Sequence, residues 1–356
     1  HDPDTGESLG LLVEESRTNL AKKSETLNNT TYWAQNYNVN AATAPSITAP
    51  DGSTDTWKLV VANNTSQQRF PLNSSQGTFT ANTYTWSIFA KAAEYSYLGI
   101  SLYDGTYYRA TFNLSNGTTS NIYNATAKIT PYANGWYRCS ITATTTANLR
   151  NNQNYADAFW PYSTDSTAGA QQTGDGTSGV YVWGPQLEVG SFPTSYITTG
   201  DSASTVTRAA DLAKITGTNF TDFYNQTEST LFVHYKLDKD NYLEAPAGVE
   251  VVSFRASGNT HGYDIRVVTD TSSPALDAHG VSNSVTQYDV SGLNLSSGFK
   301  DYLVAKAFKL NDMAVSFNGG ALQTDSSLIV YEWDKLVIGL VPRRAHYKSI
   351  KYFNKR

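Results

Sequence analysis

VYVWGPQLEVGSFPTSYITT, residues 180–199, is the stretch of this chain that indicates its fold. It opens on a fully apolar run, Val180–Trp183, passes two breakers, Gly and Pro, and then alternates polar and apolar residues to Val189. A short apolar run bounded by Gly and Pro is typical of a strand with both faces covered. The residues that follow are poor in apolar side chains until Leu212. We therefore predict that this stretch is the last core strand of one domain and its exit toward another.

Composition supports an all-β protein. At 356 residues the chain is too long for one comfortable core, so two domains are expected. Charged residues make up only 16% of the chain, and the gaps are filled with Thr, Ser, Asn and Gly. Thr and Tyr suit pleated strands, while Asn and Gly suit hairpin turns. The 24 tyrosines and seven tryptophans exceed what a core requires, which indicates a wet binding face.

Charge and cysteine content exclude several classes of protein. A net charge of −5 gives no electrostatic case for a nucleic-acid partner or an anionic membrane. The longest apolar run is far below a membrane span, so no membrane insertion is expected. The single cysteine, Cys139, excludes an intrachain disulfide framework. Its place in an alternating strand pattern with Tyr137 and Ile141 predicts a buried, inert thiol.

Strand signals recur along the whole chain. Residues 97–103 and 107–112 flank Asp104-Gly105, which predicts a hairpin. Small polar residues at 198–208 indicate a linker between domains. Strands at such spacing without helical periodicity predict β-sandwiches or barrels.

The segment near the start of the chain carries two adjacent carboxylates and an arginine, Glu14, Glu15 and Arg17. These side chains could be acid/base machinery, but no nucleophile or second base lies nearby in sequence. We favour a structural role, an ion pair or hydrogen-bonded staple. We also expect residues 11–19 to lie beside residues 183–197 and to set the angle between domains, with Trp183 in the first core.

Three segments together resemble a module of tail-fibre and other virion proteins of tailed bacteriophages. They are GLLVEESRTNL at 10–20, NGWYRC at 134–139, and WGPQLEVGSFPTSYI at 183–197 running on to TRAAD at 207–211. The resemblance implies a carbohydrate-binding-module-like jelly roll over residues 1–205. Residues 206–356 are similar, more loosely, to concanavalin-A/laminin-G-like domains. The implied fold is all-β, with two β-sandwich domains in tandem.

The resemblance also implies a function. It indicates a non-enzymatic virion protein, a tail fibre or surface fibre, that binds host cell-surface glycan during adsorption. Other virion proteins would be its partners, and a fibre would be a homo-oligomer, with a trimer the natural form. Two alternatives stay open: a purely architectural virion module without ligand, and a depolymerase of capsule or lipopolysaccharide. The start on His1 without a methionine suggests a fragment of a longer protein.

No catalytic, cofactor or metal constellation is evident. The sequence contains no Gly-x-Ser-x-Gly, His-Glu-x-x-His, phosphate loop or cysteine pair of metal-ligand spacing. Its acidic run, Asp238-Lys239-Asp240 followed by Glu244, lacks the Gly of a calcium loop, so a solvated turn is expected. A glycosidase needs two carboxylates about 5–9.5 Å apart, and no such pair is indicated. We expect no enzyme activity, cofactor or metal.

Candidate ligand-binding residues are aromatic and polar side chains expected in loops or at strand ends, because sugars are recognised by flat aromatic faces with hydrogen-bonding groups beside them. In the first domain they are Tyr103, Tyr107, Tyr108, Trp160 and Tyr162. In the second they are His261, Tyr263, Trp333, Arg343 and Tyr347.

Overall fold

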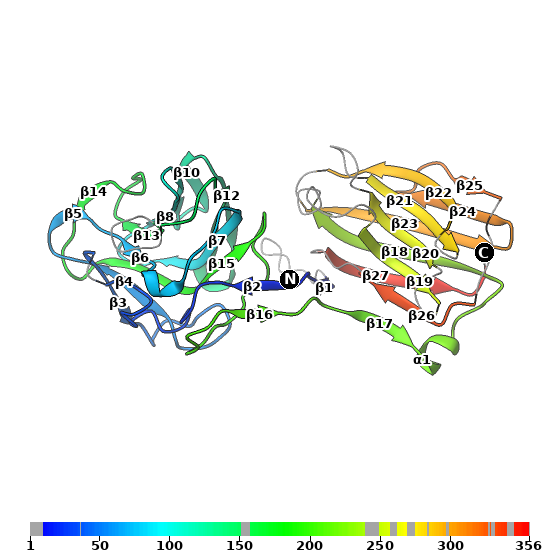
Figure 1. Cartoon of the computed structure of the whole chain (residues 1–356), viewed down its shortest axis with the longest axis horizontal. Coiled ribbons are helices and arrows are strands. Elements are labelled where there is room, and N and C mark those ends of the chain that lie inside the picture. Colours follow the sequence, from blue (N-terminus) through cyan, green and yellow to red (C-terminus); the bar gives the residue numbers. More distant parts are fainter. Residues whose placement is uncertain are drawn as a thin grey trace. The chain divides into compact units, whose positions relative to one another are not determined.

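The computed structural model describes residues 10–35, 37–150, 157–238, 249–256, 262–268, 275–282, 285–296, 299–326, 328, 332–339 and 345–355. Two compact units make up the chain (Figure 1). One is Arg17–Arg208, here the 17–208 unit. The other joins His1–Ser16 to Ala209–Arg356 and is here called the 209–356 unit. Strands dominate both units, which confirms the predicted all-β class.

The 17–208 unit is a sandwich of two antiparallel sheets. One sheet, the β7 sheet, has the order β11 (Thr126–Pro131), β12 (Trp136–Thr144), β7 (Thr83–Ala92), β15 (Gly179–Val189), β4 (Trp57–Val61), β3 (Val39–Thr43). Facing it, the β8 sheet has the order β10 (Thr118–Tyr123), β9 (Tyr107–Asn113), β8 (Tyr97–Tyr103), β13 (Ala158–Tyr162), β6 (Phe70–Pro71). Two short pairs are added, β14 (Gln171–Thr173) with β5 (Thr65–Gln67), and β16 (Val206–Arg208) with β2 (Arg17–Asn19).

The core of this unit lies between the two sheets because alternate residues of each strand point inward. Leu98, Ile100 and Leu102 of β8 meet Trp86 and Ile88 of β7 in one buried cluster. The predicted hairpin at Asp104-Gly105 is confirmed, since β8 pairs with β9 on either side of it. Cys139 is also as predicted: it is fully buried on β12, and burial raises the pKa of its thiol.

Residues 180–189 of the stretch that indicated the fold lie in β15, a central strand of the β7 sheet. The strand does not end at Gly184-Pro185. It continues past them with a shift of its register against β7 between Trp183 and Gln186. Gly184 has φ +58, and a Cβ there would lie 3.0 Å from the ring of Tyr196. The breakers therefore mark a β-bulge within one strand.

Asn19, fully buried at the end of β2, joins β15 to the segment that follows it. Its Nδ2 donates to the carbonyl oxygens of Ile197 (2.9 Å) and Pro185 (3.3 Å). Its Oδ1 accepts from the main-chain N–H groups of Leu187 (3.2 Å) and Ala21 (3.0 Å). One carboxamide thus satisfies polar main-chain groups beside it at Ala21 and, more than 160 residues along the chain, in β15 and in the segment that follows β15.

Residues 190–197 turn back over β15 and are held there by side chains of the same sheet. The carboxylate of buried Glu188 accepts from the Thr194 hydroxyl (2.5 Å) and main-chain N–H (3.1 Å). Gln186 accepts from the Ile197 N–H at 2.6 Å. Arg138 of β12 donates to the Thr194 carbonyl at 2.5 Å. We call Asn19, Arg138, Gln186 and Glu188 the polar lock.

The 209–356 unit is a second sandwich. One sheet has the order β1 (Leu11–Val13), β27 (Ala345–Phe353), β18 (Glu228–Asp238), β23 (Phe299–Lys309), β24 (Asp312–Phe317), β25 (Gln323–Asp325). The other has the order β17 (Ala213–Thr216), β26 (Lys335–Ile338), β19 (Val249–Arg255), β20 (Gly262–Val268), β21 (Ala275–Ser282), β22 (Val285–Asn294). A short helix, α1 (Thr218–Thr221), buries Phe220 in the core between these sheets.

The start of the chain is divided between the units, which differs from the expected boundaries of 1–205 and 206–356. Strand β1 pairs with β27, so Leu11–Val13 complete a sheet of the 209–356 unit. Strand β2 pairs with β16 in the other unit (Figure 1). The main chain of Glu14 exchanges hydrogen bonds with Asp211, whose Oδ2 accepts the Glu14 N–H at 2.8 Å.

We predicted that the whole segment 11–19 lies beside residues 183–197. In the structure Arg17 and Asn19 contact that stretch, whereas Leu11–Val13 pair with β27. Arg17 donates to the Val189 carbonyl and lies 4.9 Å from the centre of the Phe192 ring. Trp183 packs on Tyr196 at 4.4 Å, and its Nε1 donates to Asp55 at 3.2 Å. Its ring lies in a small cluster with Phe89 and Trp136 on the outer face of the β7 sheet. Among the described residues, no helix is long and apolar enough to cross a membrane.

The polar lock gives a stability prediction. Asn19→Ala leaves the buried N–H of Leu187 and the carbonyl of Ile197 without this partner, so it should lower the unfolding free energy of the 17–208 unit by about 2–4 kcal/mol. Urea denaturation followed by tryptophan fluorescence measures this, because all of the tryptophans except Trp333 lie in that unit. Thr18→Ala, which loses an exposed hydroxyl contact with Thr207, is the control and should change stability by less than about 0.5 kcal/mol. Equal midpoints for the two variants would contradict the assigned role of Asn19.

Candidate functional site

The outward face of the β8 sheet carries Tyr103 and Tyr107, the two described aromatic candidates that are half-exposed. Because Leu98, Ile100 and Leu102 point into the core, Tyr97 and Tyr103 of the same strand point outward. Tyr107 and Arg109 do the same on β9, where Ala110 and Phe112 are the inward residues. The hairpin therefore places two rows of polar-tipped side chains on one rigid surface.

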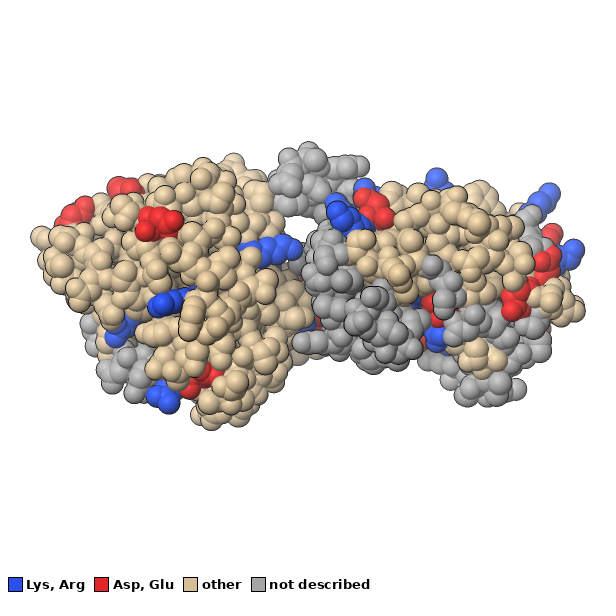
Figure 2. Space-filling view, turned by 90° about the horizontal axis from the view of Figure 1, so that it is seen from above, with Lys and Arg blue, Asp and Glu red and all other residues tan. Residues whose placement is uncertain are grey.

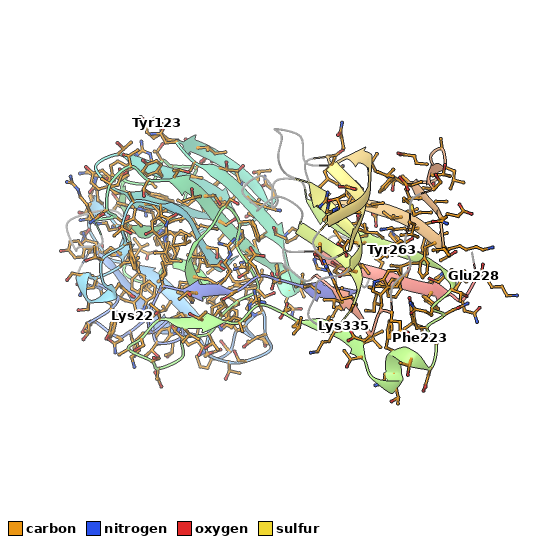
Figure 3. The ribbon with its side chains drawn as sticks, turned by 45° about the vertical axis from the view of Figure 1, so that its right-hand side comes forward. Lys22, Tyr123, Phe223, Glu228, Tyr263 and Lys335 are labelled. Atoms are coloured by element: carbon orange, nitrogen blue, oxygen red, sulfur yellow. The ribbon has the colours of Figure 1, made fainter. Side chains whose placement is uncertain are left out.

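Five of these side chains form a continuous row, here called the arginine–tyrosine ladder: Arg150, Tyr103, Tyr107, Arg109 and Tyr123. The Tyr103 and Tyr107 rings lie 4.7 Å apart. Arg109 lies 5.0 Å from the Tyr107 ring and 5.6 Å from the Tyr123 ring. Arg150 lies 5.7 Å from the Tyr103 ring. Figure 3 shows Tyr123 at the periphery of the unit, and its side chain is 51% exposed.

Trp160 and Tyr162 of β13 lie beneath this surface and are buried, which corrects their prediction as ligand contacts. The loop of residues 163–170 covers them, with Ala168 packed against both. Tyr162 accepts from the Gly169 N–H at 3.0 Å, and Trp160 donates to Ser101 at 2.8 Å. Their rings support the half-exposed Tyr103 and Tyr107, which pack on the same cluster.

A second cation–aromatic pair flanks the ladder. Arg69 lies 4.7 Å from the Tyr37 ring and 5.8 Å from the ring of Trp160. Both Arg69 and Tyr37 are half-buried. The surface therefore combines tyrosine faces with several guanidinium groups.

Two buried carboxyl groups, Asp104 and Asp157, lie under the end of the ladder. Burial acts to raise the pKa of Asp104, but the main-chain N–H groups of Thr106, Thr146 and Ala147 outweigh it and hold this pKa below its ordinary value. Tyr108 also donates to Asp104, at 3.1 Å, from the core side of β9. Tyr108 is thus a packing residue, which corrects its prediction as a ligand contact.

Asp157 is fully buried, and its Oδ1 accepts the main-chain N–H of Tyr103 at 2.6 Å. Burial raises its pKa to about 8. Its Oδ2 has no hydrogen-bond partner in the described part of the chain. Since both Asp104 and Asp157 are closed off from solvent, we assign them the structural role of fixing the ends of β8 and β13.

The second-domain candidates lie elsewhere. Tyr263, Trp333 and Tyr347 are buried in the core of the 209–356 unit, which corrects their prediction as ligand contacts. Tyr263 lies among the strands in Figure 3, with the ammonium of buried Lys306 at 3.7 Å from its ring. Tyr347 donates to the Val251 carbonyl at 2.7 Å. His261 and Arg343 lie outside the described residues.

A group of charged side chains on β19, β20 and β21 is internally paired. Arg255 contacts the carboxylates of Glu250 and Asp264, and Arg266 lies 2.9 Å from Asp277. All are buried or nearly so, and each carboxylate of the group faces a guanidinium. We assign this group a structural role. Of the acidic run predicted to be a solvated turn, Asp238 ends β18 and the rest lies outside the described residues. The described residues contain no cluster of three or more His, Cys, Asp or Glu that fits a metal ion.

Sequence reasoning found Tyr103 and Tyr107 but missed Arg109, Arg150 and Tyr123. Alternation along 107–112 puts Arg109 on the same face as Tyr107, so the sequence alone could have predicted Arg109 as a member of this surface. Arg150 and Tyr123 reach the ladder through tertiary folding, which no local pattern indicates. Charged side chains are otherwise scattered singly among uncharged residues over the face of the 17–208 unit that Figure 2 shows.

Comparison with known proteins identifies no family. No family model and no curated protein matches the chain. Among solved structures, a toad ovary galectin in complex with thio-digalactose is similar at 10% identity and a TM-score of 0.29, covering 41% of this chain and 100% of that one. An ancestral congerin is similar at 14% identity and a TM-score of 0.28, covering 38% and 97%. A homodimeric agglutinin from chicken liver is similar at 11% identity and a TM-score of 0.28, covering 40% and 100%. Likenesses at these scores carry no argument about function.

The buried carboxyl of Asp157 gives a pH prediction. Its pKa is raised to about 8 in the folded protein, whereas an unfolded chain ionises near pH 4, so folding binds a proton between these values and stability falls as pH rises through that window. Asp157→Asn keeps the acceptor for the Tyr103 N–H and removes the ionisation. We expect the variant to melt above the parent at pH 8.5 and to lose most of the difference at pH 4.5, as followed by thermal denaturation. A parent that gains stability relative to the variant on going from pH 5 to pH 8 would refute the assignment.

Proposed function

We propose that this chain is a non-enzymatic carbohydrate-binding protein and that the arginine–tyrosine ladder of the 17–208 unit holds the sugar. The observation that supports this most directly is the Tyr103–Tyr107 pair. Its rings are 4.7 Å apart, half-exposed and fixed on adjacent strands, with Arg150 and Arg109 on either side. Stacking rings and fixed donors are the two elements that a sugar requires.

The physical fit follows from the chemistry of a pyranose ring. Its C–H faces are apolar and pack on flat aromatic rings, while its hydroxyl groups need hydrogen-bond partners at the rim of the contact. Tyrosine offers both a flat face and a polar tip, and arginine offers several donors in one plane. Strands hold these groups in place before the ligand arrives, which lowers the entropy lost on binding.

We propose further that the protein belongs to the virion of a tailed bacteriophage, as a tail fibre or surface fibre. In this role it binds host cell-surface glycan during adsorption and assembles with other virion proteins as a homo-oligomer, a trimer in the simplest case. Support comes from the resemblance of residues 10–20, 134–139 and 183–211 to such proteins. Residues in these segments, Asn19, Arg138, Gln186 and Glu188, make up the polar lock. The resemblance thus rests on segments that fold the unit, and only the 134–139 and 183–211 segments and residues 10–20 carry it.

Alanine substitutions in the ladder test the proposal. Tyr103→Ala and Tyr107→Ala should each weaken glycan binding by about tenfold, because each removes one stacking face. Tyr132→Ala is the control: this ring is 41% exposed and packs against Phe89 of the other sheet. A glycan array identifies the ligands, titration calorimetry measures affinity, and adsorption of the protein to host cells gives a second readout.

Each outcome is decisive. Binding that falls for the two ladder variants and persists for Tyr132→Ala supports the proposal. A blank glycan array together with absent cell adsorption would favour a purely architectural module. Release of reducing ends from host polysaccharide would instead establish a depolymerase.

A further inference from the structure

Arg109 is a half-buried cation whose charge is not matched by a carboxylate among the described residues. Its Nη1 donates to the Ala168 carbonyl at 2.9 Å, and its guanidinium lies against the Tyr107 and Tyr123 rings. Its Nε, which is buried, has no hydrogen-bond partner within the described ranges. A cation taken partly out of water without an opposite charge is costly, so a partner anion would stabilise it.

Three other partly buried cations of the chain differ from Arg109 in this respect. Lys58 lies 2.7 Å from Glu94, Arg255 lies 3.1 Å from Asp264, and Arg266 lies 2.9 Å from Asp277. Each unit thus holds partly buried cations that are paired with carboxylates. Arg109 differs from these three cations, on a face that carries tyrosine rings.

The carboxyl groups near the ladder are committed to other partners. Asp104 receives three main-chain N–H groups and the Tyr108 hydroxyl. Asp157 is enclosed and, with its pKa near 8, carries little negative charge at pH 7. Asp165 accepts from Ser120 at 2.6 Å and from Asn121 at 2.8 Å. None of these carboxyl groups is therefore paired with Arg109 within the described residues, and the Arg109 guanidinium stays available to an anion.

We infer that the ladder selects acidic glycans, in which a sugar carboxylate binds at Arg109 while neighbouring rings stack on Tyr103 and Tyr107. This inference rests on the proposed sugar-binding function and names its ligand class: oligosaccharides with uronate-type carboxylates. Stacking on an aromatic ring uses the flat face of a guanidinium. The N–H groups lie in the plane of the guanidinium and point away from its face, where a carboxylate accepts charge-assisted hydrogen bonds. Arg69 and Arg150 at the two flanks add to the attraction.

The test uses the full chain and one pair of probes. The first probe is an oligosaccharide of alternating glucuronate and N-acetylglucosamine, and the second is the same oligosaccharide with its carboxylates converted to methyl esters. Calorimetry should show at least tenfold tighter binding of the acidic form, because hydrogen bonds to a charged group are worth more than that factor. The preference should shrink between 50 and 500 mM salt, since screening weakens exposed charge pairs.

Arg109→Gln should abolish the preference for the acidic probe and leave binding of the ester form within about threefold, because the stacking rings remain. This variant also loses the contact with Ala168, so its melting temperature is measured alongside. Arg150→Gln, altered at an exposed side chain, should reduce the preference by a smaller factor and keep the fold. Lys128→Gln, which removes an equal charge from β11 on the other sheet, is the control and should keep the preference.

Equal affinity for the two probes in the parent protein would overturn the selectivity and leave the sugar-binding proposal standing. Loss of the preference in Lys128→Gln as well would assign it to overall charge and overturn the role of Arg109. Absence of binding to both probes and to every glycan of an array would overturn both proposals.

Discussion

The carboxamide of Asn19 is the interaction on which the architecture of the 17–208 unit depends. It joins β2, the bulge of β15 and the returning segment through Leu187, Pro185 and Ile197. Gln186, Glu188 and Arg138 extend the same network, and all four side chains are buried. Buried main-chain groups must find partners, so each of these polar residues is fixed by the path of the chain around it. The network closes the outer side of the β7 sheet and leaves the β8 sheet as the face that presents aromatic side chains.

The polar lock and the ladder lie on different sheets, so the most specific sequence pattern, at residues 183–197, does not contain the residues proposed to bind ligand. The pattern WGPQLEVGSFPTSYI is specific because a bulge, two buried polar side chains and a returning segment must fit together. Its aromatic members, Trp183 and Tyr196, pack on each other at 4.4 Å. The ladder needs only two outward rings and adjacent cations on a hairpin, a requirement that many sequences meet.

Composition and strand spacing predicted the all-β class, the Asp104-Gly105 turn predicted the β8–β9 hairpin, and period-two alternation predicted the buried Cys139, because turns and strand faces follow directly from local sequence. Local sequence could not predict that β15 continues through Gly184-Pro185, since a bulge and a strand end share the same breakers. Nor could it place Leu11–Val13 on β27, a pairing between ends of the chain. Trp160, Tyr263 and Trp333 were misread for one reason: polar-tipped aromatic residues near loops serve as core packing as readily as binding faces. Burial, which is a tertiary property, separates the two uses.

Hydrogen exchange of the full chain, with and without the glucuronate oligosaccharide, tests the central claim most directly. The claim is that the β8–β9 hairpin is the ligand face and the polar lock is architecture. Saturating ligand should slow amide exchange in residues 97–113 and in the covering loop at 163–170, and leave residues 183–197 unchanged. Slowed exchange confined to 183–197, or to the 209–356 unit, would contradict the account.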